Sequence, residues 1–151
     1  MARRAQFLAL LLAAALLVGG CGEDKSKTFR DDFRPLNAKI VALGGAVGKS
    51  VMGASGKSDR QIQQTFSALG KRTGSLRKQV DGLDPPDDLK EDTADLSGAM
   101  GDAQKALGQI SAAAKKGDPD AARRATIQLV AASDDLRSSR RRLARASGVS
   151  R

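Results

Sequence analysis

The sequence predicts an all-α protein, an up-down-up-down four-helix bundle. Apolar residues recur every three or four positions through four long segments, which gives each segment one apolar face. Short turns rich in Gly, Pro and Asp separate these segments, and nothing alternates as a β-strand would. Helices joined by short turns pack most simply antiparallel to their neighbours. We therefore expect a bundle over residues 29–147 and a frayed tail over 148–151.

The first helix is expected after a short polar tether. Its apolar stripe is formed by Phe29, Phe33, Leu36, Ile40, Leu43, Val47 and Val51. Pro35 falls inside this stripe, and proline is tolerated in a first helical turn but disrupts a helix deeper in. The helix is therefore expected either to start near Arg34 or to be kinked there.

The second and third helices are bounded by clear turn signals. Ser58 or Asp59 can cap the second helix, and Asp84-Pro85-Pro86 ends it because a residue before proline is pushed out of the helical region. Pro86 is also well placed to start the third helix. The second stripe is Ile62, Phe66, Leu69, Thr73, Leu76, Val80 and Leu83, and the third is Leu89, Thr93, Leu96, Met100, Ala103, Leu107, Ile110 and Ala114.

The fourth helix is expected after the turn Gly117-Asp118-Pro119, which places Gly after one helix and Pro at the start of the next. It is rich in alanine, and its apolar face is the narrowest of the four. The stripe is Ala122, Ala125, Leu129, Ala132, Leu136 and Leu143. Ile127 and Val130 broaden this face only locally.

The glycines of residues 44–50 resemble a phosphate-binding loop of pattern G-x-x-x-x-G-K-[ST]. The spacing fails by one position, because the first glycine belongs where Leu43 stands, and a helical stripe runs through the segment. The remaining alternatives for Gly44, Gly45 and Gly48 are close helix packing or a soft segment. Each interior glycine costs about 0.5–1 kcal/mol relative to alanine.

The N-terminal segment has the three-part build of an export signal: basic Arg3 and Arg4, an apolar run over residues 5–18, and small residues before Cys21. The stretch Val18-Gly19-Gly20-Cys21 resembles the lipobox of bacterial lipoproteins. This resemblance implies that residues 1–20 are a cleaved signal peptide and that Cys21 is lipidated. Residues 21–28 would then be the lipidated cysteine and its tether.

Three other interpretations of this segment are weaker. A retained membrane helix needs about 20 apolar residues, more than this run supplies. An ordinary cleaved signal does not need a cysteine at its end. A twin-arginine signal would place an apolar residue where Gln6 stands, so general secretion is favoured.

Composition argues against catalysis. The chain has no His, Trp or Tyr, and its single cysteine is assigned to the anchor. Most metal ligands, nucleophiles and stacking platforms are therefore missing, and we expect no enzyme activity, no cofactor, no metal and no nucleic-acid partner. An acidic block could suggest calcium, but it lacks the EF-hand spacing and fits a solvated helix start better. Its members are Asp81, Asp84, Asp87, Asp88, Glu91, Asp92 and Asp95.

A basic block near the C-terminus is the candidate contact with anionic lipid or an anionic partner, the alternative being a solvated helix face. Its members are Arg137, Arg140, Arg141, Arg142 and Arg145. The up-down topology places this block at the anchored end of the bundle, beside the acidic start of the third helix. Arginines that face the third helix should pair with carboxylates, and those on the outer face should meet lipid.

These observations predict a protein anchored to the cell membrane, outside the cytoplasm, by lipid on Cys21. We expect a non-catalytic interaction or scaffolding module that holds a protein partner of the cell envelope. The alternative is a small carrier that binds an apolar ligand within the bundle. A closed core would favour the first function, and an apolar cavity of some hundreds of Å³ would favour the second.

Overall fold

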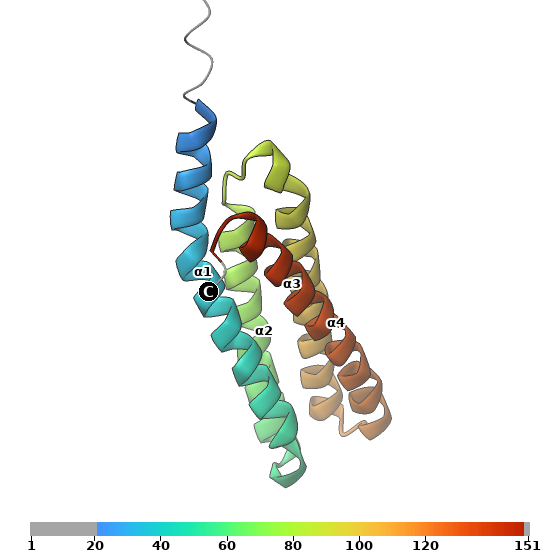
Figure 1. Cartoon of the computed structure of the whole chain (residues 1–151). Helices are drawn as coiled ribbons and strands as arrows, with labels where there is room; N and C mark the ends of the chain where they lie inside the picture. Colours follow the sequence, from blue (N-terminus) through green and yellow to red (C-terminus); the bar gives the residue numbers. More distant parts are fainter. Residues whose placement is uncertain (1–20, 150–151) are drawn as a thin grey trace, which may run out of the picture.

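The computed structural model describes residues 21–149 and confirms the four-helix bundle (Figure 1). Its elements are α1 (Cys21–Met52), α2 (Asp59–Asp81), α3 (Lys90–Lys116) and α4 (Pro119–Ala146), with one-turn 3₁₀ helices η1 (Ala54–Gly56) and η2 (Asp87–Leu89). Residues 21–149 contain no β-strand. Successive helices run in opposite directions (Figure 1), so the start of α1 and the end of α4 lie toward the same end of the bundle.

The helix boundaries follow the expected local chemistry. Ser58 caps α2 through a capping box with Gln61, in which each side chain bonds the other residue's backbone N–H. Gly117 ends α3 in the left-handed conformation at φ 63°, which a residue without Cβ adopts without strain. The Asp118 carboxylate then accepts from the Ala121 N–H at 2.9 Å, and Pro119 begins α4.

The four predicted stripes form one hydrophobic core. All their residues are buried except Val51, Ile62, Leu83 and Ala122, which are partly buried. Phe29 and Phe33 stack at a ring-centroid distance of 5.7 Å near the start of α1. The buried core residues all lie between Phe29 and Val149, so this part of the chain has a core of its own.

The predicted tether over residues 21–28 is wrong, because these residues form the first turns of α1. The Lys25 ammonium pairs with the Asp84 carboxylate at 3.0 Å, which links this part of α1 to the connection before α3. The helix continues through Pro35 and bends along its length (Figure 1). Because Pro35 is exposed, the carbonyl that it leaves unpaired can bond with water.

The frayed tail expected over residues 148–151 is wrong for Gly148 and Val149, and residues 150–151 lie outside the described part. Gly148 is left-handed at φ 71°, and the Val149 N–H donates to the Ala144 carbonyl at 2.8 Å, which completes a Schellman motif. Val149 is buried against the core. The Arg30 Nε also donates to the Ser147 carbonyl at 3.1 Å, so α1 holds the end of α4.

Close helix packing occurs in α2 rather than at the glycines of α1. A Cβ on Gly70 would lie 3.7 Å from the Leu107 Cβ, so α2 and α3 approach each other closely there. A Cβ on Gly44, Gly45 or Gly48 would meet nothing within 4 Å. The close-packing alternative for these three residues is therefore wrong, and their side of α1 faces open space.

The helices do not contribute equally to the bundle. α3 packs extensively against both α2 and α4, whereas α1 packs mainly on α2 and meets α4 over a short stretch. Figure 1 shows α1 and α4 diverging away from the end of the bundle at which α1 starts. The narrow apolar face of α4 is used against α3, which leaves Val130 and Ile127 exposed instead of broadening the core.

We predict that Gly44→Ala and Gly48→Ala each raise the free energy of unfolding by about 0.5–1 kcal/mol, because alanine restricts the unfolded chain and meets no neighbour in the folded one. Urea unfolding of the chain from Gly22 onward measures this. Gly98→Ala, at an equally open position of α3, is the matched control and should give a similar gain. A loss of stability confined to the α1 variants would mean that α1 closes onto α4.

Candidate ligand-binding groove

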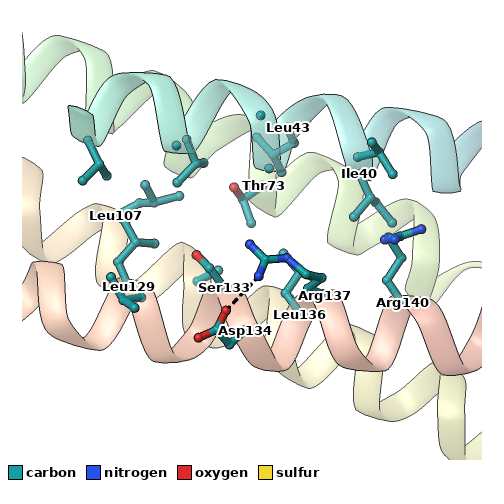
Figure 2. A pocket seen from close by; sticks show the side chains of 18 of the residues that line it. Ile40, Leu43, Thr73, Leu107, Leu129, Ser133, Asp134, Leu136, Arg137 and Arg140 are labelled. Carbon is teal, nitrogen blue, oxygen red and sulfur yellow. Dashed lines mark hydrogen bonds and ion pairs between the residues drawn. The ribbon is translucent and has the colours of Figure 1, made fainter. Parts of the chain in front are cut away.

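A groove of about 600 Å³ lies between α1 and α4 and is open to solvent. Figure 2 shows its side chains, with Leu107 and Leu129 toward one end and Arg140 beside Ile40 at the other. The groove forms because α1 meets α4 only over a short stretch. It exceeds the lower limit of about 300 Å³ typical of small-molecule sites.

The floor of the groove is apolar and belongs to the core. Leu43 of α1, Leu107 of α3 and Leu129 of α4 line it and are buried. Thr73 is the one residue of α2 that lines it. The Thr73 hydroxyl donates to the Leu69 carbonyl at 2.8 Å, which satisfies its donor within α2. The floor therefore presents hydrocarbon to any occupant.

The walls expose more apolar surface than a solvated helix face needs. Val41 and Met52 of α1 are 53% and 77% exposed, and Val130 of α4 is 55% exposed. Between Val41 and Met52, the positions of Gly44, Gly45 and Gly48 add no side chains to the α1 wall. These features make the groove largely apolar between its walls.

Three arginines of the predicted basic block line the groove. The Arg137 guanidinium lies between Arg140 and Leu129 along the groove (Figure 2) and pairs with the Asp134 carboxylate at 3.1 Å. The Arg140 Nη1 donates to the Asn37 Oδ1 at 2.9 Å, a neutral partner on α1. Arg141 is exposed and has no hydrogen bond or ion pair among the described residues.

The surroundings of Arg140 disfavour its positive charge. Burial lowers the pKa of its guanidinium from the ordinary value, and the positive charges of Arg141 and Arg137 lower that pKa further. No carboxylate of the described residues pairs with Arg140. An arginine stays protonated despite such shifts, so this end of the groove keeps a partly desolvated positive charge.

The other two arginines of the block lie outside the groove. Arg142 faces α3, where its Nε lies 3.3 Å from the Asp92 carboxylate and its Nη2 lies 2.6 Å from that of Asp95. This pairing is the one expected for arginines that face the third helix. Arg145 is exposed and has no ion pair among the described residues. The basic block thus has three parts: Arg142 pairs with α3, three arginines line the groove, and Arg145 lies on the outer surface.

The remaining predicted sites lie elsewhere. Residues 44–50 are helical within α1, whereas a phosphate-binding loop follows a strand. The acidic block is spread over several contacts: Asp81 accepts from the Ser97 hydroxyl, Asp84 pairs with Lys25, and Asp92 and Asp95 pair with Arg142. No cluster of three potential metal ligands occurs among the described residues.

Cys21 is the first residue of α1. The other lipobox residues lie outside the described part of the chain. None of the helices within residues 21–149 has the length and hydropathy that a membrane span requires.

The groove was not predicted from the sequence, although two signals point to it. Val130 falls outside the predicted stripe of α4, and the three glycines interrupt the face of α1 beside its own stripe. Their meeting depends on how far α1 lies from α4, and this spacing is a tertiary property that no local pattern encodes.

We predict that Arg142→Ala lowers the free energy of unfolding by about 0.5–1 kcal/mol, because Arg142 pairs with two carboxylates of α3. Arg145→Ala should leave the free energy of unfolding within about 0.3 kcal/mol of the parent, because an exposed charge without an ion pair contributes little. Urea unfolding at low and high salt measures both. The Arg142 effect should shrink in high salt because ions screen such pairs. Equal effects of the two variants would contradict the assigned pairing.

A search of protein-family models, curated proteins and solved structures found nothing significantly similar to this chain.

Proposed function

We propose that this chain is a lipid-anchored protein of the cell envelope with a non-catalytic binding function. The lipobox resemblance over Val18-Gly19-Gly20-Cys21 supports the anchor. Because Cys21 begins α1, a lipid on this residue would join directly to the bundle. The helix directions would then turn the arginine end of the groove toward the membrane.

The groove between α1 and α4 is the observation that carries the binding function. Of the two functions expected from the sequence, it favours the carrier of an apolar ligand, because the core opens into an apolar groove of about 600 Å³. An interaction module remains the second candidate, favoured by the exposed apolar side chains along the same groove. Both candidates use one surface and differ in the size of the occupant.

The chemistry of the groove supports binding rather than catalysis. The Thr73 hydroxyl donates to its own helix, and Asp134 is paired with Arg137. A nucleophile needs an adjacent base that can take its proton, and neither group is placed in such a pair. The arginines that line the groove can hold an anion.

We expect that Cys21→Ser leaves uncleaved precursor or soluble protein, because the anchor requires acyl chains on this thiol and each buried CH₂ contributes about 0.8 kcal/mol. Fractionation of cells that express the parent and the variant tests this. A serine variant that still fractionates with membranes as mature, lipid-modified protein would show that Cys21 is not the anchor.

The binding function is tested by a photo-crosslinking residue placed at Val130, on the groove, in intact cells. We expect adducts with an envelope component at this position and none at Gln109, an exposed position of α3 outside the groove. A small mass increase identifies a carrier, and a protein adduct identifies an interaction module. Identical products at both positions, or none at Val130, would contradict a function for the groove.

A further inference from the structure

We propose that the groove binds a single-chain anionic amphiphile, with its anionic group at Arg140 and Arg141 and its chain along the glycines of α1. This inference rests on the carrier function and adds the chemistry and orientation of the ligand. The features that lead to it are the unbalanced charge at one end of the groove, the apolar channel beyond it and the small size of the site.

The positive charge at the arginine end of the groove favours binding of an anion. Three arginines line the groove, and the Asp134 carboxylate is the one acidic group among its lining residues. Asp134 pairs with Arg137, so no carboxylate of the lining neutralises the positive charges of Arg140 and Arg141. A partly desolvated cation is stabilised when an anion pairs with it, and guanidinium groups bind carboxylates and phosphates with charge-assisted hydrogen bonds.

The apolar length of the rest of the groove favours binding of a hydrocarbon chain. From Ile40 to Met52 the α1 wall extends for about 18 Å at the helical rise of 1.5 Å per residue. Buried leucines form the floor, and the glycine positions leave open space along the α1 wall. An unbranched chain can lie in such a channel and remove the exposed surface of Met52 and Val130 from water.

The size of the site favours a small molecule over a protein. Stable protein interfaces use about 20–30 residues on each partner, and much of the lining here belongs to the buried floor. A second copy of the chain would bring the same net positive charge to this patch. Neither occupant explains a groove that is cationic at one end and apolar along the rest of its length.

The direct test is calorimetric titration of the chain from Gly22 onward, which contains the whole described core. Dodecanoate is the anionic probe, and dodecyltrimethylammonium, with the same chain and the opposite charge, is the matched probe. Both are used below the concentration at which they form micelles. We expect saturable binding of dodecanoate at one site and binding of the cationic probe that is at least about tenfold weaker.

Two pairs of variants locate the site. Gly44→Leu fills the channel and should abolish dodecanoate binding, whereas Gly98→Leu adds the same side chain at an open position of α3 and should leave binding unchanged. Arg140→Met should weaken dodecanoate binding by about tenfold, and Arg145→Met should have no effect although it removes the same charge. Thermal unfolding of each variant verifies that it folds.

Absence of dodecanoate binding would overturn the inference, and so would equal binding of both probes or equal effects within either pair of variants. These failures are distinguishable from failure of the proposed function. A protein adduct at Val130 without dodecanoate binding would overturn the ligand assignment but leave the groove as a binding site. Dimerisation through the groove, seen as a mass change that Gly44→Leu abolishes, would also overturn it.

Discussion

The two-sided packing of α3 is the interaction on which the rest of the structure depends. Leu96, Met100 and Leu107 are fully buried, and α3 packs extensively against both α2 and α4. Small residues make this possible, since Gly70 lets α2 approach α3 closely and alanines of α3 and α4 are buried along the core. The apolar faces of α2 and α4 are largely buried against α3, and α1 packs chiefly on α2. The groove is the consequence of this unequal sharing of apolar surface.

The contacts of α1 differ along its length in a way that suits a groove. Near its start, the Lys25–Asp84 pair and the bond from Arg30 to the Ser147 carbonyl hold it to the bundle, and Phe29 and Phe33 are buried in the core there. Beyond Asn37, which accepts from Arg140, its exposed face carries glycines and has no partner on α4. One end of α1 is therefore held, and the other leaves room for an occupant.

Much of the fold could be predicted from the sequence because its signals are local. The stripe positions, the Ser58 cap and the Gly117-Asp118-Pro119 turn depend on periodicity and backbone chemistry within a few residues. Longer-range contacts contributed to both errors. The supposed tether is helical where Lys25 meets a distant carboxylate, and part of the supposed frayed tail is held by a Schellman turn and by Arg30.

The candidate site was harder to predict for the same reason. The arginines could be read as one block, but their roles depend on which helix each one faces. Arg142 pairs with α3, Arg140 lies at the end of the groove, and Arg145 is exposed outside it. Because of their spacing along α4, these side chains point in different directions around the helix. The positions of α1 and α3 determine which residues each side chain contacts.

We propose that the open side of the core, between α1 and α4, receives a ligand chain. Nuclear Overhauser contacts between the methylene groups of bound, ¹³C-labelled dodecanoate and the protein methyl groups test this most directly. We predict contacts with Val47, Leu107 and Leu129, which line the groove. Contacts confined to methyl groups outside the groove, such as those of Ile62 or Leu83, would contradict binding in the groove.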